Sequence, residues 1–205
     1  MLVNNAGYGL VGGVEEVSNA EARQIFETNF FGALEVMRAV LPIMRKQKSG
    51  HILNISSVGG FKSFAGFGLY NATKFALEGA SEALALETKP LGIKVTIVEP
   101  GSFRTNWAGA SLKTAEQVIS DYAESSGKTR SFIQEENGQQ PGDPASAAKA
   151  MIQVVEASEP PLRLVLGADA LGSIRDKMSS VAKELDNWES TTTGTAFANS
   201  EVSVS

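Results

Sequence analysis

The chain has 205 residues, enough for one α/β domain, and a hydrophobic fraction of 42%, which is typical of a soluble globular protein. A formal net charge of −5 without a basic run argues against nucleic acid or an anionic membrane as a partner, because either would require a positive face. The absence of cysteine excludes disulfides and thiol catalysis.

The first elements are a strand and a long helix. Residues 2–4 are typical of the end of a buried strand, and a glycine-rich loop leads to a capping box formed by Ser18 and Glu21. The helix that starts there runs to about Lys48 and contains the longest apolar stretch, residues 30–44. Charged residues interrupt this stretch, which predicts a core helix rather than a membrane span. The chain opens directly on a strand without a signal-peptide pattern, which favours a cytoplasmic location.

The remaining elements complete an alternating pattern. The sequence predicts strands at residues 51–56, 93–98 and 162–166 and a helix at residues 69–88. It also predicts a helix capped by Asp143 and a last helix that is capped by Asp169 and reaches Trp188. This alternation indicates an α/β fold, a Rossmann-like doubly wound parallel sheet, over residues 1–188. Residues 106–141 are polar and irregular, which predicts a mobile flap with one or two short helices. Residues 189–205 are rich in Ser and Thr and are expected to form a disordered tail.

Tyr70 and Lys74 are the most informative pair of residues. They are four positions apart on a predicted helix and therefore lie on the same face, so the ammonium can lie beside the phenol. At roughly 5 Å and an effective dielectric near 20, the attraction is about 3 kcal/mol, or about two pK units. We therefore expect Lys74 to lower the pKa of Tyr70 toward a range that is useful in general acid and base catalysis. By itself the pair is more often a solvated helix flank, with Lys74 paired to Glu78.

Further motifs follow the predicted strands. Asn5, Ala6 and Gly7 follow the first strand, Ser57 follows the second, and the segment 100–105 follows the third. Ligands bind beyond the carboxyl ends of the strands in an open parallel sheet, so one crevice would collect these motifs.

The segment Gly7–Gly12 matches the dinucleotide fingerprint G-x-G-x-x-G. A phosphate site requires a helix that opens directly from the turn, whereas here Glu15 and Glu16 intervene before the capped helix. We therefore interpret this segment as a flexible loop whose backbone flanks a substrate. The single histidine, His51, has no neighbouring ligands in the sequence, and no metal site is predicted.

Together these motifs resemble the short-chain dehydrogenase/reductase family. The likeness spans residues 2–166 and rests on Asn4-Asn5-Ala6-Gly7, Asn29, Asn54-Ile55-Ser56-Ser57, Tyr70-x-x-x-Lys74 and Pro100-Gly101-x-x-x-Thr105. It implies an oxidoreductase that uses NAD or NADP to interconvert a carbonyl and an alcohol by hydride transfer. Family members carry about three strand and helix units before the Asn-Asn-Ala-Gly strand, including the glycine-rich cofactor turn, so we expect an N-terminally truncated member.

The resemblance implies a role for each residue. Tyr70 would transfer the proton, Lys74 would also bond to the nicotinamide ribose, and Ser57 would donate to the substrate oxygen. Asn29, on the apolar face of the first helix, would bind a water that links the lysine to solvent, and Asn4 would tie strands together. The implied cofactor contacts are Asn5, Ala6, Gly7, Tyr70, Lys74, Pro100, Gly101, Phe103 and Thr105.

Substrate and partners are less specifically indicated. Aromatic residues gather in loops near the predicted site and favour a small hydrophobic substrate: Phe61, Phe64, Phe67, Phe103 and Trp107. The resemblance implies a homodimer or tetramer formed through the two long helices. NAD and NADP are not distinguished, because the residue that reads the ribose 2′ position lies in the part expected to be absent.

Two alternatives remain open. One is a non-catalytic truncated fragment that acts, if at all, by protein association. The other is a nucleotide-sugar epimerase or dehydratase, which shares Tyr-x-x-x-Lys but is disfavoured by the Pro-Gly loop and the short C-terminal part.

Overall fold

The computed structural model describes residues 1–197. Its centre is a parallel sheet in the order β1-β3-β4-β6. The four strands are β1 (Leu2–Asn4), β3 (Gly50–Ile55), β4 (Ile93–Pro100) and β6 (Arg163–Leu166). The predicted α/β class and Rossmann-like parallel sheet are confirmed.

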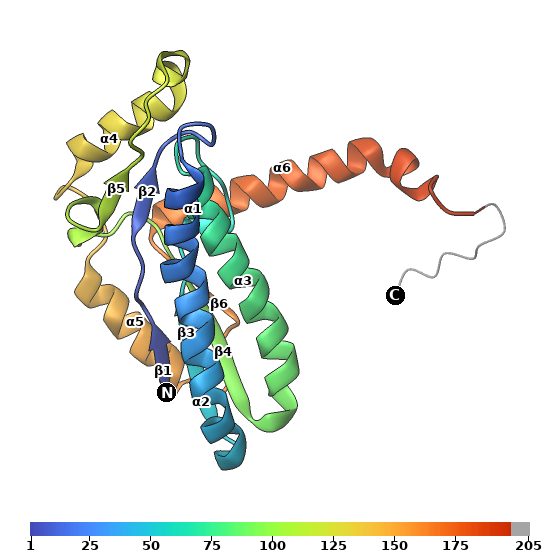
Figure 1. Ribbon diagram of the computed structural model, residues 1–205. Helices are drawn as coiled ribbons and strands as arrows, with labels where there is room; N and C mark the ends of the chain where they lie inside the picture. Colours follow the sequence, from blue (N-terminus) through green and yellow to red (C-terminus); the bar gives the residue numbers. More distant parts are fainter. Residues whose placement is uncertain (198–205) are drawn as a thin grey trace.

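One face of the sheet is covered by long helices. α1 (Asn19–Phe26), a π-helical turn (Glu27–Gly32) and α2 (Ala33–Gln47) run on without a break, and α3 (Gly68–Thr88) follows β3. Figure 1 shows α1 to α3 along this face and α5 (Pro144–Glu156) beyond the other. The predicted capping box is present, with the Ser18 amide donating to Glu21 at 2.8 Å. The π-helical turn was not predicted.

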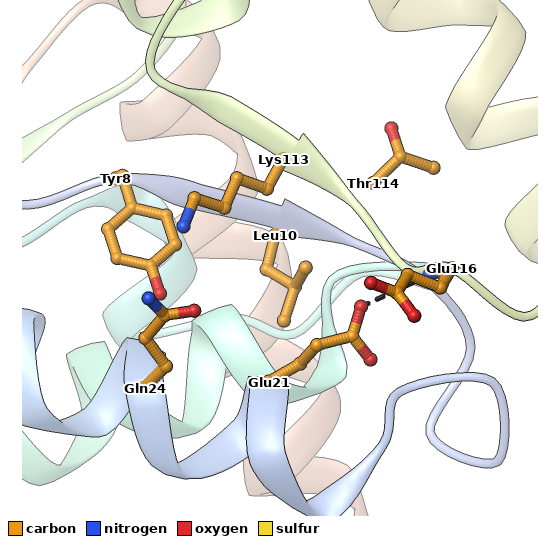
Figure 2. Close-up of a pocket in the computed structure, with 7 residues that line it drawn as sticks. All are labelled: Tyr8, Leu10, Glu21, Gln24, Lys113, Thr114 and Glu116. Carbon is orange, nitrogen blue, oxygen red and sulfur yellow. Dashed lines mark hydrogen bonds between the residues drawn. The ribbon is translucent and has the colours of Figure 1, made fainter.

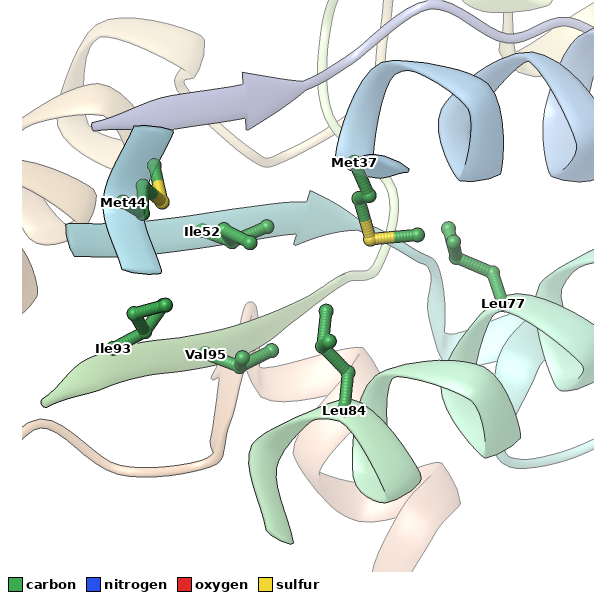
Figure 3. Packing of buried hydrophobic residues seen from close by; sticks show 7 residues of the cluster. All are labelled: Met37, Met44, Ile52, Leu77, Leu84, Ile93 and Val95. Carbon is green, nitrogen blue, oxygen red and sulfur yellow. The ribbon is translucent and has the colours of Figure 1, made fainter. Parts of the chain in front are cut away.

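The main core lies between α2, α3 and the two central strands. Figure 3 shows its buried side chains, which are Met37, Met44, Ile52, Leu77, Leu84, Ile93 and Val95. The continuous apolar runs of β3 and β4 are therefore buried as a parallel sheet requires.

The segment after β1 is not a flexible loop, as we had interpreted it. Gly9–Val11 forms a buried strand, β2, which pairs in parallel with β5 (Leu112–Thr114) in a second, two-stranded sheet. β5 lies inside the flap that was expected to be irregular. The flap also contains α4 (Lys128–Glu136), which agrees with the expected short helices. A strand of three residues has too little periodicity to be recognised in the sequence.

The C-terminal helix differs from the prediction at both ends. α6 spans Ala168–Thr193, and the residue before it is Gly167 with φ 99°, so Asp169 is not its cap. Asp169 instead accepts a hydrogen bond from the Ser102 amide at 2.7 Å. Residues 189–193, which we had assigned to a disordered tail, are helical, and residues 198–205 lie outside the described residues.

Candidate active site

Tyr70 and Lys74 lie one helical turn apart on α3, at the carboxyl end of β3. Both are 6% exposed. The Lys74 ammonium donates to the carbonyl of Ile55, the last residue of β3, at 2.8 Å, and lies 5.9 Å from the centre of the Tyr70 ring. The structure thus brings the predicted pair together beside the strand end that precedes Ser57.

Burial controls the pKa values of this pair. It raises the pKa of Tyr70 to about 12, against a hydrogen bond with Ser57 that lowers it. Burial also lowers the pKa of Lys74 to about 8, opposed by the charge of Glu78. The expected lowering of the Tyr70 pKa by Lys74 is wrong for this arrangement, because the phenol loses its hydration while the ammonium bonds to Ile55 instead.

Ser57 has two contacts at the start of a 3₁₀ turn (Val58–Gly60). Its hydroxyl accepts a hydrogen bond from the Gly59 amide at 3.0 Å, which caps the turn, and it also bonds to Tyr70. The cap fixes the Ser57 hydroxyl beside the Tyr70 phenol, so that both hydroxyls could donate hydrogen bonds to the same substrate oxygen.

Asn29 connects the loop after β1 to the helices. It is 1% exposed and exchanges two hydrogen bonds with the backbone of Tyr8, at 2.9 and 3.0 Å, and a third with Thr73 at 3.2 Å. A Cβ atom on Gly7 would lie 3.1 Å from the Asn29 side-chain oxygen and 3.6 Å from the Lys74 nitrogen. A side chain at position 7 would therefore crowd Asn29, while Lys74 would remain at an ordinary contact distance. The π-helical turn places Asn29 here, and such turns are frequent at functional sites.

The residues that follow the other strands lie at the same edge of the sheet. Asn4 donates to Asn54 at 2.8 Å, which confirms that it ties β1 to β3, while Asn5 and Ala6 are exposed just beyond β1. Pro100 ends β4.

The loop after β4 is held against the start of α6. A Cβ atom on Gly101 would overlap the Asp169 carboxylate, so this position requires glycine. Phe103 pairs with Gly142, and the Thr105 hydroxyl accepts from the Trp107 amide at 3.2 Å. This loop reaches Tyr70 through Trp107.

Two of the five predicted aromatic residues cover the phenol. The Trp107 and Phe67 rings lie 5.4 and 5.8 Å from the Tyr70 ring, and Leu10 and Ile25 pack in the same cluster. The other three lie elsewhere: Phe61 stacks with Arg163, Phe64 lies near Lys62, and Phe103 packs on Gly142. A Cβ atom on Gly9 would lie 2.6 Å from the Trp107 ring, so Gly9 belongs to this cluster although we had not predicted it.

A buried carboxylate that the sequence did not reveal joins the flap to the body. Glu16 accepts hydrogen bonds from the Gly13 amide at 2.5 Å, the Ile119 amide at 2.9 Å and the Ser126 hydroxyl at 2.9 Å, and pairs with Arg130 at 2.6 Å. Its partners in the flap lie more than 100 residues away in sequence, so no local pattern could have indicated this contact.

A cavity of about 320 Å³ opens between α1 and the β2-β5 pair (Figure 2). It is lined by Tyr8, Leu10, Glu21, Gln24, Lys113, Thr114 and Glu116. The predicted catalytic residues are not among them, so this cavity does not mark the candidate site. Within residues 1–197, no three His, Asp or Glu side chains are grouped to hold a metal ion. No helix in that range combines the length and apolar character needed to cross a bilayer.

The family model and the similar known proteins identify the same protein family. Residues 1–116 match the family model for short chain dehydrogenase. The 3-ketodihydrosphingosine reductase of Bacteroides thetaiotaomicron is 40% identical over 170 residues, which are 82% of this chain and 62% of that protein. The chain thus spans about three fifths of the length of the curated relatives that it matches.

Solved structures agree with this match. A short-chain dehydrogenase from Streptomyces avermitilis has a TM-score of 0.88 at 47% identity and covers 95% of this chain, which corresponds to 71% of that protein. ElxO, solved with NADP bound, has a TM-score of 0.64 at 26% identity, over 83% of this chain and 67% of ElxO.

Proposed function

Because the chain belongs to the short-chain dehydrogenase family, we propose that the protein is an NAD(P)-dependent oxidoreductase with Tyr70 as its general acid and base. It would interconvert a carbonyl and an alcohol on a small hydrophobic substrate. The observation that carries the proposal is the convergence of Tyr70, Ser57 and Lys74 at the carboxyl end of β3.

The residues around Gly7 fit the nicotinamide half of the cofactor. Gly7 approaches both Asn29 and Lys74, which places the loop after β1 beside the candidate catalytic lysine. In the proposal, Lys74 and Thr105 hold the nicotinamide and its ribose. The nicotinamide ring would supply or accept hydride when bound. The other proposed contacts are Asn5, Ala6, Gly7, Tyr70, Pro100, Gly101 and Phe103. The segment Gly7–Gly12 is not proposed as a pyrophosphate site, because Gly9–Val11 is a strand.

Tyr70 would donate its phenolic proton to the substrate oxygen during reduction and accept it back during oxidation. Ser57 would donate to the same oxygen as negative charge develops there. With its pKa raised to about 12, the buried phenol is protonated at neutral pH and has a proton to donate. It is a weaker acid than a free tyrosine, so the proposed step needs the developing charge to be stabilised by Ser57. We further propose that Asn29 orders a water beside Lys74, so that the proton is replaced from solvent.

The aromatic cover over Tyr70 supports a hydrophobic substrate. Phe67 and Trp107 lie against the phenol, so a ligand that displaces Trp107 would contact aromatic faces on entry. A relative named 3-ketodihydrosphingosine reductase supports a ketone as the carbonyl class.

Substitution of Tyr70 tests this proposal. In a version of the protein that also carries the N-terminal units expected from the family, Tyr70→Phe should lower turnover at least about 100-fold, the usual contribution of general acid catalysis, with cofactor affinity kept within a few fold. Lys74→Met should weaken cofactor binding as well, which fluorescence titration with reduced nicotinamide would measure. Tyr122→Phe, which removes a hydroxyl in the flap, is the matched control. Turnover by Tyr70→Phe above about a tenth of the unsubstituted rate would refute the assignment. A version with the expected N-terminal units that still binds neither NAD nor NADP would favour the non-catalytic alternative.

A further inference from the structure

α6 continues well beyond the body of the protein. Its first turns are anchored by Ala170 and Ile174, which are 0% and 6% exposed. From about residue 182 onward every helical residue is exposed, and Figure 1 shows this part projecting away from the sheet. A free helical segment of this length is marginally stable in water, because helices shorter than about 12 to 15 residues gain little without packing.

One face of α6 carries a regular apolar row. The residues follow the alternating three and four spacing of heptad positions a and d, and we call them the α6 seam: Leu171, Ile174, Met178, Val181, Leu185 and Trp188. Large side chains of the seam remain in water, with Met178 58%, Leu185 62% and Trp188 64% exposed. Such a row is costly to expose and matches the interface of a helix pair.

We propose that the α6 seam is a self-association surface, on which a second copy of the chain packs its own α6 in the antiparallel direction. Self-association is favoured over lipid because the projecting segment is not basic. Residues 175–189 contain three basic and four acidic side chains, so the helix offers no positive face to an anionic membrane.

The flanking charges favour the antiparallel direction. In a parallel pair, Glu184 at position g would lie near the partner's Glu189 at position e, twice by symmetry, and these charges repel. In an antiparallel pair that joins Met178 to the partner's Trp188, Arg175 lies near the partner's Glu189, twice by symmetry. The small Ala182 then lies at the crossing point, and the two Glu184 side chains form one unfavourable contact. The antiparallel pair thus has two attractive contacts and one repulsive contact, whereas the parallel pair has two repulsive contacts and no attractive one. The flanking charges therefore favour the antiparallel pair.

The same pairing uses the part of the seam beyond Ile174, where Val181 is half-buried and the other residues are exposed. Met178 meets the partner's Trp188 and Val181 meets the partner's Leu185, while Ile174 keeps its place against the body. The two bodies then lie at opposite ends of the helix pair. This surface is separate from α2 and α3, through which the family resemblance implies association.

Cysteine crosslinking in the whole chain tests the proposal, since the chain contains no cysteine of its own. Two differently tagged copies, one with Met178→Cys and one with Trp188→Cys, would be coexpressed, oxidised and separated on a non-reducing gel. We expect a heterodimer band several-fold stronger than in copies that carry Ser190→Cys, which lies off the seam. Equal crosslinking through Ser190→Cys would show unspecific contact and overturn the proposal.

Two further measurements complete the test. Light scattering should give at least twice the 21.7 kDa chain mass for the unsubstituted protein and half the unsubstituted mass for Leu185→Glu, whether or not α2 and α3 also associate. Circular dichroism would verify the fold of the variant. A monomer mass for the unsubstituted chain would overturn the proposal. Strong crosslinking of Leu185→Cys to itself would indicate a parallel pair and overturn the antiparallel arrangement. Sedimentation with phosphatidylserine vesicles, without crosslinking, would assign the seam to lipid instead.

Discussion

Two buried carboxylates, Glu16 before α1 and Glu99 near the end of β4, have opposite pKa shifts although each lies beside an arginine. Burial raises the pKa of Glu16, but hydrogen bonds from two backbone amides, Arg130 and Ser126 outweigh it and lower the pKa to about 2. Burial raises the pKa of Glu99 to about 7, helped by the charge of Glu78 and opposed by Arg163.

The difference lies in hydrogen bonding rather than in the presence of a counter-ion. Arg163 lies 3.0 Å from Glu99 but also pairs with Glu78 and Glu82. Its contact with Glu99 is close but lacks the geometry of a good hydrogen bond, and within residues 1–197 no other group donates to the Glu99 oxygens. A buried charge is stable only where its lone pairs are satisfied. The Glu16 region therefore holds the flap to the body, whereas Glu99 is a buried carboxylate that shares its arginine with two other carboxylates.

The largest expected effect is that of Glu16→Gln. It leaves Arg130 without its buried counter-ion and should lower the free energy of unfolding by about 3 to 5 kcal/mol in denaturant titrations. Hydrogen exchange in residues 112–136 should become faster. Glu15→Gln is the matched control, because Glu15 is exposed and accepts from the Tyr122 hydroxyl. Equal effects of the two substitutions would contradict a special role for Glu16.

The same residue predicts a dependence of stability on pH. Its folded pKa of about 2 lies below the ordinary 4.5, so its contribution is present above pH 4.5 and is lost as the pH falls toward 2. Glu16→Gln should therefore differ most from the unsubstituted protein above pH 4.5, and the difference should shrink in acid.

Glu99→Gln should change the free energy of unfolding by less than Glu16→Gln does. Its effect should be stabilising and should increase as the pH rises. Its folded pKa of about 7 lies above 4.5, so stability from the neutral form is lost as the pH rises from 4.5 through 7. Relative to the unsubstituted protein, Glu99→Gln should gain on the order of 1 to 2 kcal/mol between pH 5 and pH 8 in denaturant titrations. A constant difference across that range would show that Arg163 neutralises Glu99 fully.

The smallest expected effect is that of Ser126→Ala, which removes one hydrogen bond to Glu16. It should cost about 1 kcal/mol of unfolding free energy and raise the acid midpoint of unfolding slightly. Ser125→Ala, at the exposed neighbouring position, should change neither quantity.

Much of the fold follows from local patterns. The capping box at Ser18, the apolar runs of β3 and β4 and the helical face that joins Tyr70 to Lys74 all depend on residues close in sequence. Strand β2, by contrast, exists because Gly9–Val11 meets β5 about a hundred residues later. Asp169 has an ordinary helix-capping pattern, but the Ser102 amide competes successfully for its carboxylate.

The sequence by itself determined the parallel α/β pattern, the family motifs and the spacing that places Tyr70, Lys74 and Ser57 at one strand end, because helix and strand periodicity are local properties. Only the tertiary structure decided that Trp107 covers the phenol, that Glu16 fastens the flap and that burial raises the Tyr70 pKa. Those outcomes depend on how much water the packed chain excludes and on which distant groups supply hydrogen bonds, and neither is encoded in residue spacing.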